Sequence, residues 1–191
     1  GDAIRAVLLG TGANAAGRTI GLSLPNGDAQ AALMRDVIAR AGVTPDRFLA
    51  FEAHGTGTRA GDPAEAGAIG QGRQTPLPMG SVKTNLGHLE AGSGMAGLLK
   101  AMLVLEHGAV PPTLHFREPN PDIDFAALNL AVPAALTPAA PREDSVVGVN
   151  SFGFGGTNAT AILGRAPAPK RTRREKTGVA PPLILSARSQ A

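Results

Sequence analysis

The sequence predicts an α/β layered fold, and three observations support this prediction. Short apolar runs of strand length alternate with helical patterns rich in small residues over most of residues 1–164. Polar clusters follow several predicted strands, which is where such folds bind their ligands. No apolar run reaches membrane-spanning length, and 43% hydrophobic with 17% charged residues is typical of a soluble globular protein.

The first third of the chain predicts two strands and two helices. The expected strands are residues 4–9 and 48–53, and the expected helices are residues 29–41 and about 63–70. GTGANAAG, after the first strand, is interpreted as a glycine-rich structural turn, because its third glycine is misplaced for a dinucleotide-binding loop. Asp28 is the expected N-cap of the first helix, and Gly42 its end. Asp62-Pro63 is typical of a helix start.

Residues 79–108 predict a short strand, a polar turn and then a helix. The turn holds Lys83, Asn85 and His88, and Gly108 is the expected C-cap. Apolar residues at three- and four-residue spacing predict this helix, which is expected to be buried: Met95, Leu98, Leu99, Met102, Leu103 and Leu105. A cation, an amide and an imidazole at a helix entrance are suited to developing negative charge.

The last part of the folded body predicts four more strands. Two are short and lie in a proline-rich region, at 111–116 and 128–132, and two are strong, at 146–150 and 158–163. The strong pair is expected to form neighbouring strands around the turn SFGFGGT.

Charge divides the chain into a body and a tail. Residues 165–191 carry seven Lys/Arg and one acid, so this tail is +6 and residues 1–164 are −3. Four prolines in the tail favour a linker over a nucleic-acid-binding arm. The chain has no cysteine, which excludes disulfides, thiolate metal sites and a cysteine nucleophile within it. No two of the four histidines have zinc-ligand spacing, so no metal site is expected.

Three motifs stand out: EAHGTGT at 52–58, SVKTNLGH at 81–88 and NSFGFGGTN at 150–158. Each alone has a structural explanation, such as a core histidine or a packed phenylalanine pair. Together they resemble the C-terminal half of the β-ketoacyl synthase (ketosynthase) domain of modular type I polyketide synthases, which has a thiolase-like fold of α-β-α layers. PPLILSARS in the tail is similar to the start of the linker toward a following acyltransferase region, so 165–191 is expected to be that linker.

The resemblance implies decarboxylative Claisen condensation of an acyl thioester with a malonyl-type extender on an acyl carrier protein. It implies that two imidazoles stabilise the developing enolate and that a phosphopantetheine arm arrives with the carrier protein, with no cofactor bound to the chain itself. The implied roles are enolate stabilisation for His54 and His88, support of that network by Lys83, an acidic partner for His88 in Glu90, pantetheine binding by Thr56 and Thr58, and gating by Phe154.

The nucleophilic cysteine of the family lies in the first half of the domain, and this chain contains none. The expected partners are therefore an N-terminal ketosynthase half carrying that cysteine, the acyl carrier protein and a second copy in a homodimer, with no nucleic acid or membrane, in the cytoplasm. Thr160 stands where histidine is common in the family. Two alternatives remain: a non-elongating structural or carrier-binding half, and a fatty-acid synthase ketosynthase.

Overall fold

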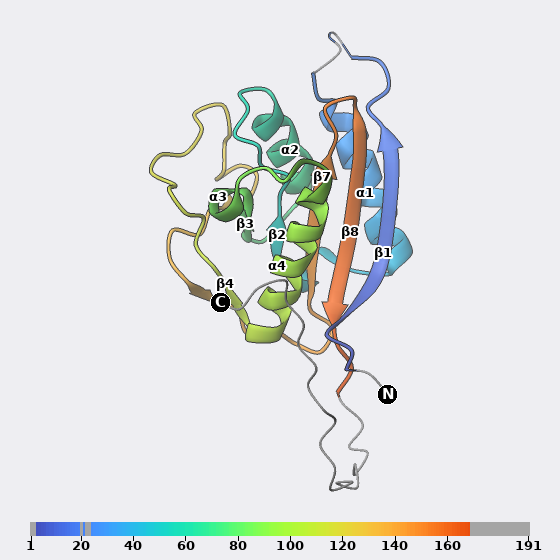
Figure 1. Ribbon diagram of the computed structural model, residues 1–191, viewed down its shortest axis with the longest axis vertical. Helices are drawn as coiled ribbons and strands as arrows, with labels where there is room; N and C mark the ends of the chain where they lie inside the picture. The colour runs from blue at the N-terminus through green and yellow to red at the C-terminus, as the bar shows by residue number, and fades with distance from the viewer. Residues whose placement is uncertain (1–2, 20, 22–23, 169–191) are drawn as a thin grey trace, which may run out of the picture.

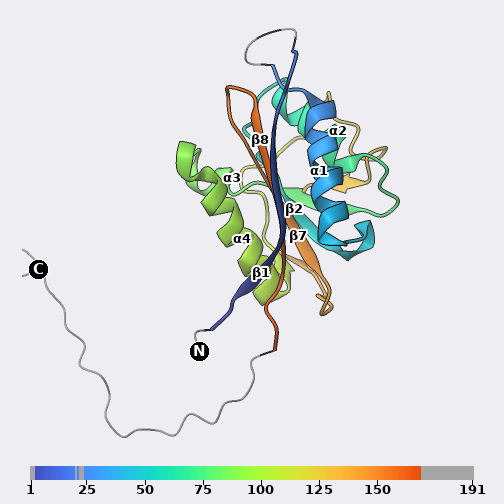
Figure 2. The same cartoon turned by 90° about the vertical axis from the view of Figure 1, so that its right-hand side faces the viewer.

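A six-stranded sheet runs through the centre of the protein, in the order β1-β8-β7-β2-β3-β5 (Figure 1). The computed structural model describes residues 3–19, 21 and 24–168. Helices α1 (Gly27–Ala41) and α2 (Gly61–Gly70) cover one face of the sheet and α4 (Ser93–His107) covers the other (Figure 2). The predicted α/β layering is confirmed.

Four of the strands are parallel and define the edge where the polar motifs meet. β2 (Phe48–Glu52) pairs in parallel with β3 (Leu77–Gly80) on one side and with β7 (Val146–Phe152) on the other. β3 also pairs in parallel with β5 (Leu130–Ala131). Because parallel strands end at the same edge, the segments after β2, β3 and β7 are brought together.

The other two strands complete the sheet with antiparallel pairing. β8 (Thr157–Arg165) returns beside β7 around the glycine-rich turn, as predicted. β1 (Ala6–Ala15) pairs with β8 and includes most of the segment that was expected to be a turn. That expectation was wrong because the glycines serve close packing: a Cβ at Gly12 would lie 2.6 Å from Cγ2 of Val37 on α1.

The start of α1 differs from the prediction by two residues. Asn26 is the N-cap, and its side-chain oxygen accepts a hydrogen bond from the backbone N–H of Ala29 at 3.1 Å. Asp28 therefore lies within the first turn, where its charge suits the helix dipole. Gly42 ends the helix in the left-handed conformation, as predicted (φ 65°). Helix α2 has Ala60 as its N-cap, so Pro63 is not its first residue.

The polar segment after β3 is more helical than the sequence indicated. It contains a four-residue helix, α3 (Lys83–Leu86), and a 3₁₀ turn, η2 (Glu90–Gly92), before α4 begins. The small residues of α4, together with Val104 and Leu105, pack against the sheet. Met95, Leu99 and Leu103, which were expected to be buried, are 60%, 50% and 42% exposed. The small residues occupy the face that approaches the sheet, because they allow close contact.

The proline-rich region holds little regular structure. The strand expected at 111–116 is not formed, because Pro111 and Pro112 supply no backbone N–H for a ladder, and the strand expected at 128–132 shortens to β5. A separate two-stranded sheet joins β4 (Ala109–Val110) to β6 (Thr137–Pro138), and a 3₁₀ turn, η1 (Pro45–Arg47), precedes β2. Almost all of the expected linker, 165–191, lies outside the described residues. Among the helices that are described, none is long and apolar enough to cross a membrane.

Candidate functional site

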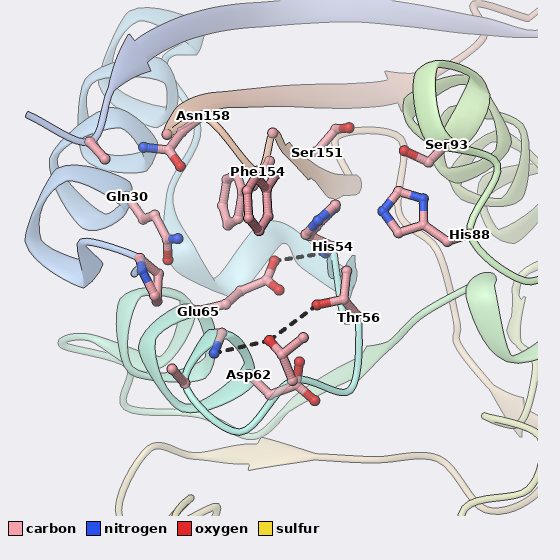
Figure 3. Close-up of a pocket in the computed structure, with 18 of the residues that line it drawn as sticks. Gln30, His54, Thr56, Asp62, Glu65, His88, Ser93, Ser151, Phe154 and Asn158 are labelled. Atoms are coloured by element: carbon pink, nitrogen blue, oxygen red, sulfur yellow. Dashed lines mark hydrogen bonds between the residues drawn. The ribbon is translucent and has the colours of Figure 1, made fainter. Parts of the chain in front are cut away.

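A cleft of about 940 Å³ opens where β2 and β7 end, beside the start of α4 (Figure 3). Glycine-rich segments 55–57 and 153–156 form part of its walls. Six of the seven site residues expected from the sequence line it: His54, Thr56, Thr58, His88, Glu90 and Phe154. Residues that are separated by up to 100 positions in the chain therefore share one cavity.

The two imidazoles lie next to each other. His54 follows the end of β2, and His88 lies between α3 and η2. Their ring centroids are 5.5 Å apart, and the rings meet edge to face at 83°. The ring centroid of Phe152 lies 5.6 Å from that of His54. The two histidine-bearing segments thus converge on one point of the cleft.

Backbone geometry fixes which nitrogen of His88 carries a proton. Its Nδ1 accepts a hydrogen bond from the backbone N–H of Glu90 at 2.9 Å. A neutral His88 therefore carries its proton on Nε2, which is left as a donor. Glu90 has a positive φ of 50°, and its contact with His88 is made by its main chain. Among the described contacts, the acidic side chain of Glu90 makes no hydrogen bond to His88.

His54 is half-buried and remains neutral near pH 7. Burial lowers its pKa to about 4, and the positive charge of Lys83 acts in the same direction. Its Nδ1 is buried and has no hydrogen-bond partner among the described residues. A neutral imidazole offers one N–H donor, which is the form needed to stabilise a negatively charged oxygen.

A buried carboxylate on α2 holds the backbone that carries His54. Glu65 accepts hydrogen bonds from the N–H groups of His54 and Gly55, at 2.8 and 2.9 Å, and from Nδ2 of Asn150 at 2.9 Å. Gly55 has a φ of 48°, and a Cβ there would lie 2.7 Å from Cβ of Ser81. Burial raises the pKa of Glu65, while these hydrogen bonds favour its charged form. Glu65 was not predicted from the sequence, where its signal is a single acid within a small-residue helix.

Asn150 extends the hydrogen-bond network of Glu65 to the antiparallel strands β7 and β8. Its side-chain oxygen accepts a hydrogen bond from the hydroxyl of Thr160, and both side chains are buried. Thr160 is the position at which the resemblance noted in the sequence implies a histidine. The Thr160 hydroxyl donates to the Asn150 side chain, so both buried groups have a hydrogen-bond partner with threonine at this position.

A second buried carboxylate, which was not predicted either, ends β2. Glu52 forms a salt bridge with Lys100 of α4 (Oε2 to Nζ, 2.6 Å) and accepts a hydrogen bond from the N–H of Val82 at 2.5 Å. Lys83 follows Val82, is half-buried and does not line the cleft. Burial lowers the pKa of Lys83, while the charges of Glu65 and Glu52 oppose that change. The described contacts include no hydrogen bond between Lys83 and His88.

The threonines form one rim of the cleft at the start of α2. The hydroxyls of Thr56 and Thr58 are 3.3 Å apart, and Thr58 also accepts a hydrogen bond from the N–H of Gly61 at 3.1 Å. Phe154 lies at the tip of the turn between β7 and β8 and is 83% exposed. The described residues contain no group of three or more acidic, histidine or cysteine side chains placed to hold a metal ion.

The sequence is similar to β-ketoacyl synthase family models and to polyketide synthases. Residues 5–117 match the family model "Beta-ketoacyl synthase, C-terminal domain", and residues 119–191 match "Ketoacyl-synthetase C-terminal extension". The partially reducing polyketide synthase men1 of Menisporopsis theobromae is 52% identical over 171 residues, which cover 85% of this chain and 7% of that protein. Polyketide synthase GfsA of Streptomyces halstedii is 44% identical over 206 residues, covering 99% of this chain and 3% of that protein.

Solved structures with the same fold are also ketosynthases. The oxazolomycin ketosynthase domain OzmH KS7 of Streptomyces albus JA3453 superposes with a TM-score of 0.83 at 36% identity, covering 89% of this chain and 32% of that one. Ketosynthase twelve of the bacillaene polyketide synthase from Bacillus amyloliquefaciens gives 0.82 at 36% identity, covering 87% and 31%. The chain therefore spans less than a tenth of these curated relatives and about a third of these solved domains.

Proposed function

The chain belongs to the β-ketoacyl synthase family, and from this premise we propose that it supplies the two-histidine half of a polyketide ketosynthase. The expected thiolase-like fold is that of the solved neighbours. The proposed enzyme is an acyltransferase that joins an acyl thioester to a malonyl-type extender. The carbon–carboxylate bond of the extender breaks, carbon dioxide leaves, and the electron pair becomes an enolate. The enolate carbon then attacks the acyl carbon and releases the thiolate that held it.

The convergence of His54 and His88 is the observation that supports this reaction. Negative charge develops on the thioester oxygen of the extender, and two N–H donors aimed at one point stabilise such charge. His88 has Nε2 free to donate, and His54 is neutral because its pKa is depressed to about 4. In our proposal Lys83 supports this pair through its charge. Glu90 supports it through its backbone contact with His88.

The cleft also suits an extended thioester arm. Its volume of about 940 Å³ lies at the upper end of the range for small-molecule sites, roughly 300–1,000 Å³. We assign Thr56 and Thr58 to hydrogen bonds with the phosphopantetheine arm that the carrier protein delivers. Phe154, exposed between glycines, is assigned to gating, because glycines allow the backbone of that turn to move. The arm is substrate, and no cofactor is proposed to reside in the chain.

The nucleophile must come from another segment, because this chain has no cysteine. We propose that an N-terminal ketosynthase half carries it and covers the exposed face of α4, where Met95, Leu99 and Leu103 lie. An exposed apolar face of this kind marks an interaction surface. Dimerisation, a cytoplasmic location and the linker role of residues 165–191 belong to the same proposal.

The test is release of carbon dioxide from malonyl-carrier protein by the full-length protein. Substituting His88→Ala or His54→Ala should slow release by about 10²- to 10³-fold, since each removes one donor to the developing charge. His107→Ala is the matched control, because His107 is exposed at the end of α4 and outside the cleft. A folded His88→Ala protein with the full rate would refute the proposal, and no release even from the unsubstituted protein would favour the non-elongating alternative.

A further inference from the structure

A buried ion pair lies just outside the cleft and is not explained by the roles assigned so far. The side chains of Glu52 and Lys100 are 5% and 13% exposed, and their charged atoms are 2.6 Å apart. Neither residue lines the cleft. Burying an ion pair costs desolvation that its attraction barely offsets, so replacement by apolar residues is often neutral or stabilising. Stability alone is therefore a weak explanation for its presence.

The fold is shaped to seat this pair. Gly97 of α4 lies against it, where a Cβ would come within 3.2 Å of Cγ of Glu52 and 3.1 Å of Cγ1 of Val149. Gly80, at the end of β3, lies near the other partner: a Cβ added there would be in ordinary contact with Nζ of Lys100 at 3.5 Å, and it would crowd the hydroxyl of Thr113 at 2.7 Å. Gly97 therefore leaves room for the side chain of Glu52 between α4 and the sheet.

The pair is tied directly to both histidine-bearing segments. Glu52 lies two residues before His54, and the next N–H, of Ala53, donates to the carbonyl of Gly80 at 2.8 Å. The other oxygen of Glu52 accepts from the N–H of Val82 at 2.5 Å, at the start of α3. From there the four-residue helix α3 leads to Gly87, whose N–H donates to the carbonyl of Lys83 at 2.9 Å, and then to His88.

We infer that the Glu52–Lys100 pair is a positioning device that holds residues 80–88 against the end of β2 and so keeps His88 at its working distance from His54. Lys100 orients the carboxylate from α4, and Glu52 passes that constraint to the backbone of Val82. Both act through other residues and touch no substrate. The catalytic part of this inference rests on the proposed function, whereas the structural part does not.

Two single variants and one double variant of the full-length protein test the inference. Glu52→Gln and Lys100→Met each break the ion pair, and Glu106→Gln is the matched control. Glu106 lies on the same helix and pairs with Arg5 at 2.6 Å on the surface, far from the site. The double variant Glu52→Met with Lys100→Met removes both charges, so its melting temperature should exceed that of either single variant.

Two measurements are made on each variant. Hydrogen exchange of the peptide covering 80–90 should accelerate by about tenfold or more in the singles and the double, and not in Glu106→Gln. The kcat for carbon dioxide release should fall about 10- to 100-fold with KM little changed, because a displaced donor costs rate more than binding. The double variant separates positioning from stability, since it should recover its melting temperature but not its kcat.

The inference is overturned if exchange of 80–90 in Glu52→Gln matches the control, or if the double variant recovers kcat together with melting temperature. If the unsubstituted protein releases no carbon dioxide, the proposed function fails by itself. The exchange measurement then still decides whether the pair holds the segment, because it needs no activity.

Discussion

His54 has the properties of a hydrogen-bond donor rather than of an acid. It is half-buried, its pKa is lowered to about 4, and it contacts the rings of His88 and Phe152. An imidazole that stays neutral across the physiological range has a constant donor capacity. Its proton does not have to leave before the reaction can proceed.

The depressed pKa of His54 predicts a pH-dependent stability. The ordinary pKa of histidine is 6.5, so between pH 6.5 and about 4 the unfolded chain binds a proton at His54 that the folded protein does not. The contribution of neutral His54 to the free energy of unfolding is therefore fully present above pH 6.5 and is lost as pH falls toward 4. Replacing His54 by Gln, which does not titrate, should reduce the drop in melting temperature between pH 7 and pH 4.5. Melting temperatures are measured by circular dichroism. If they fall equally with pH in the two proteins, the depressed pKa of His54 is contradicted.

The chemistry-bearing residues were predictable from sequence only where they lie in motifs. His54 and His88 follow strands within glycine-rich segments, and the structure brings both into the cleft. Glu65, and Glu52 although it opens the EAHGTGT motif, were missed, because a single acid at a strand end or on a helix is ordinarily solvated. Their burial depends on which backbone N–H groups approach them, and that is set by the tertiary fold.

Among the elements, β7 approaches β2 through a position that only glycine fits. A Cβ at Gly148 would lie 2.3 Å from Cε2 of Phe51, a buried ring of the neighbouring strand. Gly148→Val should therefore destabilise the protein by about 1–3 kcal/mol or more through overpacking.

The measurement for this variant is urea unfolding of the full-length protein. Gly67→Ala in α2 is the control, since a Cβ there meets nothing within 4 Å and alanine favours the helix by up to about 1 kcal/mol. Equal midpoints for Gly148→Val and the unsubstituted protein would show that the strands adjust without cost.

Element prediction succeeded where one periodicity dominated a segment. The strands at 48–53 and 146–150 and the helix ending at Gly42 were placed within a few residues, because their apolar patterns are strong. The segment at 10–17 was assigned to a turn because glycine more often supplies a turn than a packing surface. Only the position of α1 reveals that Gly10 and Gly12 lie beneath a helix.

At the scale of the whole molecule, α4 presents an exposed apolar face. Three apolar side chains lie there, at the positions 95, 99 and 103 that recur every four residues. The sequence predicts a buried helix, whereas in this chain alone these three side chains are exposed. If a second half of the domain covers α4, the helix is buried in the assembled protein.

Coexpression of this chain with a separate N-terminal half tests that surface. Leu99→Asp should weaken their association by about 10- to 100-fold, since burying one leucine contributes about 1.5–3 kcal/mol. Leu136→Asp is the control, because Leu136 is 65% exposed in the segment before β6. Copurification of the two halves at equal yield with Leu99→Asp would exclude α4 from the interface.

The parallel pairing of β2 with β3 has a consequence for how the proposed ketosynthase can diversify. One imidazole follows each strand, and neighbouring strands lie about 4.8 Å apart whatever their side chains are. Main-chain hydrogen bonding thus brings the two histidine-bearing segments together, while the contacts of residues 80–88 set the final gap between the rings. In the proposed ketosynthase, loops around the cavity can therefore accumulate substitutions that alter which acyl groups enter, while the strands that bring the two segments together stay the same.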